Sequence, residues 1–258
     1  EGGNFGLFAS AEMAAKVNAK IYAEADRLGV KWILGGECGH MWRVAHQYMN
    51  SMNGPAPAGL EVPRNPVTGT VFRQAASAKM IHIAELSADL LLHQALRLDA
   101  SRNDHLVVTF HDSCNPARSM GLLEEPRIVL RAACRHFVEM PENTIRERTF
   151  CCGSGAGLNT EELLTLRMQG GLPRGHALRH VQRHNRVNTL ACICAIDRNS
   201  LRPLADYWAP GVKVAGLHEL LGNALVVPGE GPRNTDLRQV PLPSGGSGAP
   251  LAEEGRDS

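Results

Sequence analysis

Two adjacent cysteines, Cys151 and Cys152, run directly into a glycine-rich turn at residues 153–157. The side chains of adjacent residues usually diverge, so a strain-free disulfide between these two is not expected. Two neighbouring thiolates can instead hold one metal cluster from one side, and Gly153 and Gly155 would let the backbone approach a bulky inorganic group. The alternative is a pair of buried free thiols in a tight turn.

Two further cysteines, Cys114 and Cys194, fall in loops that directly follow predicted strands. Stretches of 36 and 41 residues separate Cys114 from Cys151 and Cys152 from Cys194. Thiolates select soft metals, which in proteins means zinc or iron–sulfur clusters. Structural zinc sites normally contain two short Cys-x₂-Cys motifs, and this sequence has none. The spacing therefore favours a cluster held by loops at strand ends.

Composition limits the classes of protein to be considered. The chain has 258 residues, a formal net charge of +1 and 43% hydrophobic residues, so it can build a core and lacks the basic surface typical of nucleic-acid binding. No apolar run is long enough to span a bilayer, and no signal-peptide pattern opens the chain. Seven cysteines in a chain of this length indicate reduced thiols, some of them metal ligands. The sequence begins at Glu1 rather than Met, and we expect it to be part of a longer protein.

The order of the predicted elements is typical of an α/β fold in which parallel strands are covered by helices. Strands are predicted at 30–34, 81–84, 106–110, 188–193 and 212–215, and helices at 8–28, 41–49, 86–98, 126–137, 160–168, 178–184 and 217–226. The cysteine loops then lie at the carboxyl ends of strands, where open α/β sheets bind ligands. From residue 228 onward, Gly, Pro, Ser and charged residues predict a disordered tail.

An internal repeat relates the two halves of the chain. The matched segments are 1–7 with 152–158, 33–43 with 189–199, and 84–86 with 215–217. In this alignment Cys38 lies over Cys194, and Met41 lies over Asp197. The alignment predicts three parts: residues 1–101 as the second half of a degenerate first repeat, 102–227 as a complete second repeat that binds the cluster, and 228–258 as the tail.

The combined pattern resembles the CCG cysteine-rich domain of heterodisulfide reductase catalytic subunits, which also occurs in iron–sulfur subunits of glycolate and lactate oxidases. Four motifs carry the resemblance: Gly-Glu-Cys-Gly-His-Met-Trp-Arg (36–43), Phe-His-Asp-Ser-Cys-Asn-Pro-Ala-Arg (110–118), Phe-Val-Glu-Met (137–140) and Phe-Cys-Cys-Gly-Ser-Gly-Ala-Gly-Leu (150–158). Within this family they are most similar to the K subunits of the dissimilatory-sulfite-reductase-associated (Dsr) membrane complexes. The resemblance covers about residues 1–227.

The resemblance implies a non-cubane [4Fe-4S] cluster. Matched position by position, its ligands are Cys114, Cys151, Cys152 and Cys194. The family's last cysteine falls on Asp197, so either Asp197 supplies an oxygen ligand, or Cys192 substitutes, or one iron is left open. Asp197 could instead only cap the helix that follows it. We expect Asp197 within reach of the cluster, Cys192 packed away in its strand, Cys134 in the core, and no second complete cluster at Cys38.

Disulfide chemistry also needs protons when thiolates leave. His40, Glu37 and His111 lie in the strand-end loops and could supply them, although such residues often make only local hydrogen bonds. Arg43 and Arg118 each follow a cysteine by four or five residues. They could steady an anionic thiolate, or they could lie on solvated helix faces.

The implied function is that of the catalytic iron–sulfur subunit of a heterodisulfide-reductase-like complex, cytoplasmic and peripheral at the inner face of the membrane. Such a subunit couples a quinone pool to the disulfide or trisulfide of a small sulfur-carrier protein, the Dsr C protein. Its other partners would be a cytochrome b-type membrane subunit and further subunits of the complex. Two alternatives remain: an iron–sulfur subunit of a glycolate or lactate oxidase, and a non-catalytic interaction module stabilised by zinc or thiols.

Overall fold

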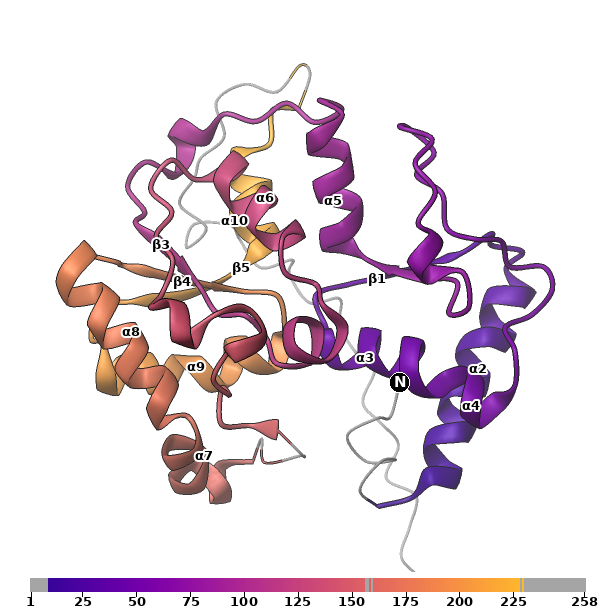
Figure 1. Ribbon diagram of the computed structural model, residues 1–258, viewed down its shortest axis with the longest axis horizontal. Helices are drawn as coiled ribbons and strands as arrows, with labels where there is room; N and C mark the ends of the chain where they lie inside the picture. The colour runs from indigo at the N-terminus through magenta and orange to yellow at the C-terminus, as the bar shows by residue number, and fades with distance from the viewer. Residues whose placement is uncertain (1–8, 156–157, 159, 228, 230–258) are drawn as a thin grey trace, which may run out of the picture. The chain divides into compact units, whose positions relative to one another are not determined.

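In the computed structural model, strands form two separate parallel sheets (Figure 1). The smaller sheet pairs β1 (Ile33–Gly35) with β2 (Met80–His82). The larger sheet has the order β3 (Val108–Phe110), β4 (Thr189–Cys192) and β5 (Lys213–Gly216). Parallel neighbours need long crossover connections, and helices supply them here. The predicted α/β class, with parallel strands covered by helices, is confirmed.

The structure describes residues 9–155, 158, 160–227 and 229. Residues 1–227 cluster as one unit and residues 228–258 as another, and only the first is described below. The predicted disordered tail, apart from residue 229, lies outside the described residues. Residues 1–7, which the repeat alignment places over 152–158, lie outside them as well.

Most of the helices overlap a predicted range, and their ends differ from the predicted ends by up to six residues. They are α2 (Ala11–Arg27), α3 (Gly39–Val44), α4 (Asn50–Asn53), α5 (Ile83–Leu92), α6 (Glu125–Ala133), α7 (Leu164–Gly170), α8 (Leu172–Asn185), α9 (Ala195–Trp208) and α10 (Leu217–Ala224). A π-helical segment, Ala45–Met49, joins α3 to α4. The predicted helix at 126–137 is shorter than expected, because Cys134 adopts an extended conformation directly after α6. In the part of the chain that the structure describes, no helix is long and apolar enough to cross a membrane.

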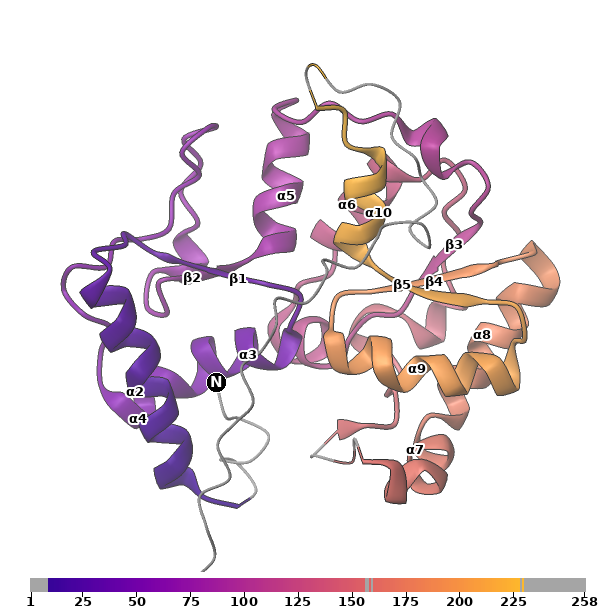
Figure 2. The same ribbon diagram turned by 180° about the vertical axis from the view of Figure 1, so that it is seen from behind.

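Helices cover both faces of the larger sheet (Figures 1 and 2). Helices α6 and α10 pack on one face against a cluster that includes Phe110 and Ala191. Helices α8 and α9 pack on the other face with Leu190 and Cys192. Successive β4 residues therefore enter opposite layers, as the two-residue period of a strand requires. All four residues of β4 are buried, as is usual in a parallel sheet covered on both sides.

The order strand, cysteine loop and helix occurs twice in the described residues. We call residues 9–101 the N-terminal half and residues 102–227 the C-terminal half. In the first, β1 leads through Cys38 into α3; in the second, β4 leads through Cys194 into α9. Each cysteine occupies the N-cap position of its helix, and each preceding strand has a parallel neighbour. The expectation that Cys38 and Cys194 lie at equivalent strand ends is confirmed.

The positions at which α5 and α10 begin change one detail of the repeat alignment. The Glu85 carboxylate accepts a hydrogen bond from the backbone N–H of His82 at the start of α5 (2.7 Å). The Glu219 carboxylate accepts one from the backbone N–H of Gly216 at the start of α10 (3.1 Å). Glu85 therefore corresponds to Glu219, whereas the sequence alignment placed it over Gly216. The similar Leu-rich sequences after both positions allowed this slip.

Candidate metal centre

A cavity of about 200 Å³ lies where the loops after β1, β3 and β4 meet the Cys-Cys turn. Its lining includes Cys114, Cys152, Cys194 and Asp197, together with His40 and Arg43. This volume is well above the roughly 10–15 Å³ that holds one water molecule. The cavity brings together the cysteines of three loops that are far apart in the sequence.

Cys151 is the most exposed thiol of the group and a hydrogen-bond acceptor. Hydrogen bonds from Cys114 and Cys152 hold the pKa of Cys151 well below its usual range, and the backbone N–H of Gly153 adds another at 3.2 Å. The same bonds to Cys151, together with burial, raise the pKa of both Cys114 and Cys152. Negative charge is thus favoured at Cys151, the most exposed of these three cysteines.

Cys194 is buried at the start of α9 and hydrogen-bonds with Cys38, which raises the pKa of Cys194. Cys38 itself accepts a hydrogen bond from the backbone N–H of Met41 (3.4 Å) at the start of α3. Cys192 has no exposed surface, and its Sγ lies 3.9 Å from the Cys194 carbonyl oxygen and 3.7 Å from that of Ala215. The structure therefore packs Cys192 in the strand, as expected, and brings Cys38 to Cys194.

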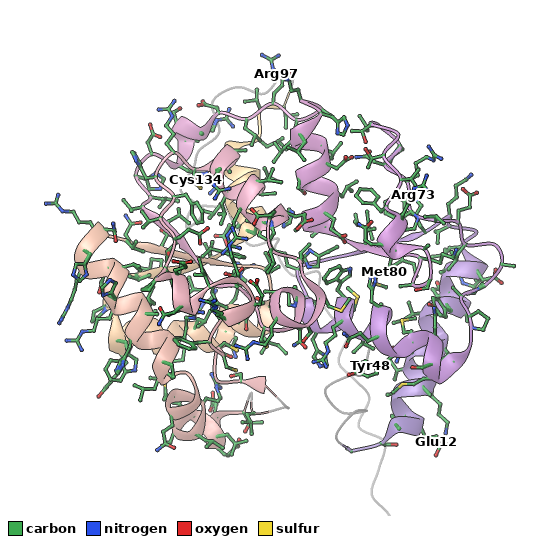
Figure 3. All side chains as sticks on the ribbon, viewed as in Figure 1. Glu12, Tyr48, Arg73, Met80, Arg97 and Cys134 are labelled. Carbon is green, nitrogen blue, oxygen red and sulfur yellow. The ribbon has the colours of Figure 1, made fainter. Side chains whose placement is uncertain are left out.

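Cys134 lies elsewhere. It is buried in the cluster formed with α6 and α10, on the opposite face of the sheet from Cys192. Figure 3 labels it beside these helices. Burial raises the pKa of Cys134 to about 11. The expectation of a core thiol is confirmed.

Asp197 is buried in the first turn of α9 and belongs to the cavity wall. It accepts a hydrogen bond from Ser113 Oγ, and His111 Nε2 lies 3.5 Å from its Oδ2. Burial opposes ionisation, but the charge and hydrogen bond of His111, followed by the hydrogen bonds of Cys152 and Ser113, lower the pKa of Asp197. The N-cap of α9 is Cys194, so Asp197 does not hold the cap position considered from the sequence.

The three candidate proton donors have different surroundings. His40 lines the cavity, and His111 is fully buried beside Asp197. The Glu37 carboxylate instead accepts a hydrogen bond from the His218 backbone N–H (2.7 Å) and lies 2.8 Å from His218 Nδ1. Burial raises the pKa of Glu37, but these contacts outweigh it and lower the pKa overall. Glu37 thus joins its loop to the start of α10, whereas His40 lines the cavity and His111 is buried behind Asp197 of the cavity wall.

The two glycines of the Cys-Cys turn have different roles. Gly153 has a φ of +94°, and a Cβ there would lie 2.2 Å from the carbonyl oxygen of Arg167 in α7. The close approach at Gly153 is therefore to a helix backbone. Gly155 has open space around its Cα and lines the cavity. Of the two, Gly155 is the one that could allow an inorganic group to approach.

A buried ion pair fixes the loop that carries Cys114. The fully buried guanidinium of Arg127 donates two hydrogen bonds to Asp112, both of 2.8 Å, and two more to Glu139. Asp112 also accepts from the Arg146 backbone N–H (2.7 Å). Such bidentate pairs are geometrically specific. Asp112 belongs to a motif that the sequence shows, but no pattern in the sequence indicated that Arg127 is its partner.

A second buried arginine, Arg174, contacts the segment that directly precedes the Cys-Cys turn. Arg174 donates from Nη2 to the Thr144 carbonyl (2.6 Å) and to Thr149 Oγ1 (2.8 Å), and its guanidinium carbon stands 5.8 Å from the centre of the Phe150 ring. Burial lowers the pKa of Arg174 to about 10, against the opposing charges of Asp112, Asp197 and the two adjacent cysteines. Arg174 thus places positive charge near the thiols. No sequence motif indicated it.

The two arginines considered from the sequence are held by neighbouring loops. Arg43 Nη1 donates to Asn115 Oδ1 (3.0 Å), and Arg43 lines the cavity. Arg118 Nε donates to the Glu147 carbonyl (3.0 Å), and its Nη2 donates to the Thr149 carbonyl. Arg43 therefore forms part of the cavity wall, while Arg118 joins the loop after β3 to the segment before Cys151.

Comparison with known proteins finds a cysteine-rich domain family and iron–sulfur proteins. The family model "CCG: Cysteine-rich domain" matches residues 108–171. The chain is 47% identical, over 94% of its length, to the Hdr-like menaquinol oxidoreductase iron-sulfur subunit of Archaeoglobus profundus and covers 46% of that protein. It is 48% identical to the iron-sulfur subunit 2 of the same kind from Archaeoglobus fulgidus, with the same coverage.

A shorter match extends the relationship. Over 81 residues, or 31% of this chain and 19% of the relative, it is 36% identical to one subunit of the dihydromethanophenazine:CoB--CoM heterodisulfide reductase of Methanosarcina mazei. No solved structure matches. The chain spans about half the length of the two Archaeoglobus relatives. It contains a CCG cysteine-rich domain and is related to the iron–sulfur subunits of Hdr-like menaquinol oxidoreductases.

Proposed function

We propose that this chain is the cluster-binding part of a heterodisulfide-reductase-like catalytic subunit that acts on sulfur–sulfur bonds. The observation that carries the proposal is the convergence of cysteines from three distant loops, with Asp197, around one cavity. The CCG match over residues 108–171 includes the first of these loops and the Cys-Cys turn.

The chemistry of these side chains fits a non-cubane [4Fe-4S] cluster bound by Cys114, Cys151, Cys152 and Cys194. Cysteine thiolates are the usual ligands of iron–sulfur clusters, and each thiolate can bind a different iron. Ligands of a cluster therefore surround a volume. In the part of the chain that the structure describes, no three His, Cys, Asp or Glu side chains are grouped to hold a single ion. Three cysteines line the cavity instead, and the fourth, Cys151, hydrogen-bonds with two of them.

The residues around the cavity suit disulfide chemistry. When bound, the cluster would supply the electrons that cleave or form a sulfur–sulfur bond. His40 stands at the cavity, where its ring can give a proton to a leaving thiolate or take one back. His111 is buried beside Asp197 of the cavity wall, with its Nε2 3.5 Å from the carboxylate. The guanidinium of Arg43, steadied by Asn115, attracts an anionic sulfur into the opening.

The partners follow from the family resemblance and from the names of the relatives. We assign the chain to the K-type subunits of Dsr-like complexes, with the disulfide or trisulfide of a small sulfur-carrier protein, the Dsr C protein, as substrate. The two Archaeoglobus relatives are named as menaquinol oxidoreductase subunits, which supports coupling to a quinone pool. A cytochrome b-type membrane subunit would make that connection at the inner face of the membrane.

Metal analysis of anaerobically purified protein tests the proposal. We expect iron and acid-labile sulfide, lost almost completely in Cys151→Ser because a ligand is removed. The matched control is Cys134→Ser, which should keep both because Cys134 lies in the core away from the cavity. Stoichiometric zinc without iron in the parent protein would contradict the proposal. If iron is present, turnover of glycolate or lactate, without turnover of carrier disulfide, would contradict the substrate assignment.

A further inference from the structure

Cys38 belongs to the N-terminal half, yet its thiol lies at the candidate metal centre of the C-terminal half. It hydrogen-bonds with Cys194, which is 156 positions further along the chain. The residue two positions after it, His40, lines the same cavity as Cys114, Cys152 and Cys194. Three cysteines thus line the cavity, and Cys151 and Cys38 each hydrogen-bond with a lining cysteine. This group of five has one cysteine more than the CCG motif supplies from the C-terminal half.

The loop that carries Cys38 is fixed against both neighbouring cysteine loops. A Cβ on Gly39 would lie 2.2 Å from Pro116 Cδ, so only glycine allows this contact with the Cys114 loop. The carbonyl oxygen of Glu37 accepts a hydrogen bond from the Ala195 backbone N–H (3.1 Å), directly after Cys194. These contacts lie on either side of Cys38, so its Sγ has little freedom to leave the site.

The C-terminal half lacks one thiol of the family's motif. Asp197 stands in that position, and carboxylate oxygen is a harder ligand than sulfur and suits an iron–sulfur cluster less well. Its carboxylate already accepts from Ser113 and faces His111. Cys192, the other nearby thiol, is fully buried and directed at carbonyl oxygens. Neither the Asp197 carboxylate nor the Cys192 thiol is well placed to supply the missing thiolate ligand.

We propose that Cys38 is the fifth thiolate of this centre and replaces the missing motif cysteine from the opposite half of the chain. The inference rests on the proposed function, because it requires a cluster in the cavity. Its ligand set is Cys38, Cys114, Cys151, Cys152 and Cys194. Asp197 is then a positioning residue, which accepts a hydrogen bond from Ser113 and faces His111.

The test compares Cys38→Ala with Cys192→Ala in the full-length holoprotein purified without oxygen. The readouts are iron and sulfide per chain and the electron paramagnetic resonance spectrum of the cluster. We expect Cys38→Ala to lose about one of the four irons, or to keep four with a changed spectrum, because one iron loses its thiolate. Cys192→Ala should keep both the iron content and the spectrum of the parent.

A second variant separates loss of a ligand from damage to the fold. Adding Asp197→Cys to Cys38→Ala restores the motif cysteine, and we expect it to recover iron content and much of the parent spectrum. Parent-like iron and spectrum in Cys38→Ala would overturn the inference while leaving the proposed function intact. Failure of the double variant to recover either quantity would also count against it. Absence of iron from the parent protein would instead overturn the proposed function itself.

Discussion

The two halves of the chain repeat the order strand, cysteine loop and helix, yet they hold their cysteine loops differently. In the C-terminal half, the Cys114 loop is fastened from within by Asp112 and the buried Arg127. In the N-terminal half, the Cys38 loop is fastened largely by the other half, through Gly39 against Pro116 and Glu37 against His218. Two loops at equivalent positions of a repeated order of elements can thus be held by different contacts, one within its own half and the other from the opposite half.

The two sheets also show that the C-terminal half is the more extensively packed one. The larger sheet places β4 between two parallel neighbours, whereas β1, its counterpart, has only β2 beside it among the described residues. Helices cover both faces of the larger sheet, and residues of the N-terminal half, Trp42 and Ala84, join one of its two cores. The C-terminal half is therefore the scaffold to which the N-terminal half is packed.

The largest expected effect is the loss of the internal anchor of the C-terminal half. Arg127→Ala leaves Asp112 buried without its cationic partner, which typically costs about 3–5 kcal/mol of unfolding free energy. The measurement is denaturant unfolding of the protein without bound metal. Arg131→Ala is the matched control, since its side chain is 56% exposed and its contact with Glu139 is 4.0 Å. If Arg127→Ala lowers the unfolding free energy by less than about 1 kcal/mol, the Arg127–Asp112 ion pair is not what distinguishes the two halves.

A smaller effect is expected from the glycines near the two cysteine loops. Gly153→Ala forces a side chain into a φ of +94° and against the Arg167 carbonyl, so we expect a loss of roughly 1–3 kcal/mol. Gly36→Ala, in the N-terminal half, meets no atom within 4 Å and should change stability by less than about 0.5 kcal/mol. Thermal unfolding of both variants checks the difference. Equal losses of stability in Gly153→Ala and Gly36→Ala would contradict the conclusion that the Cys-Cys turn is packed more tightly than the Cys38 loop.

The smallest effect concerns acid stability of the N-terminal half. Burial raises the pKa of Asp89, but hydrogen bonds from Thr68, Thr70 and Asn65 outweigh it and lower the pKa overall. A lowered folded-state pKa stabilises the protein above the unfolded pKa, which is about 3.9, and this contribution disappears as the pH falls through the folded value.

Asp89→Asn should therefore lower the unfolding free energy at neutral pH, and the difference from the parent should shrink as the pH falls below about 4. Unfolding curves at several pH values measure it. The exposed Asp104, 40% accessible in its pair with Arg135, provides a control in Asp104→Asn. A difference that stays constant with pH in Asp89→Asn would contradict the role given to this carboxylate.

Sequence periodicity predicted the strands and most helices because those patterns are local. All four residues of β4 are buried, and the turn after Cys152 is marked in the sequence by its glycines. The position of Cys38 could not be predicted in this way, since the sequence marked it only as a degenerate counterpart of Cys194. Its contact with Cys194 depends on how two distant loops pack.

The buried arginines escaped prediction for a related reason. Arg174 lies in a helix of otherwise polar, histidine-rich sequence, where an arginine normally faces solvent. Only the fold brings Thr144 and Thr149 to its guanidinium. The glycine at 153 was predicted to be important, but the sequence could not tell that its neighbour is the backbone of α7.

The shared core also has a consequence for the order of events during folding. Trp42 is buried with Val108, Leu217 and other residues far along the chain, so its burial requires contacts of long sequence separation. Such contacts form slowly, because long loops must close before they are made. The cavity walls come from residues 40 to 197, and they can meet only when both halves have docked. We therefore expect insertion of the cofactor to be a late step in maturation that follows docking. Docking can be timed by tryptophan fluorescence in a variant that keeps Trp42 and lacks Trp32 and Trp208.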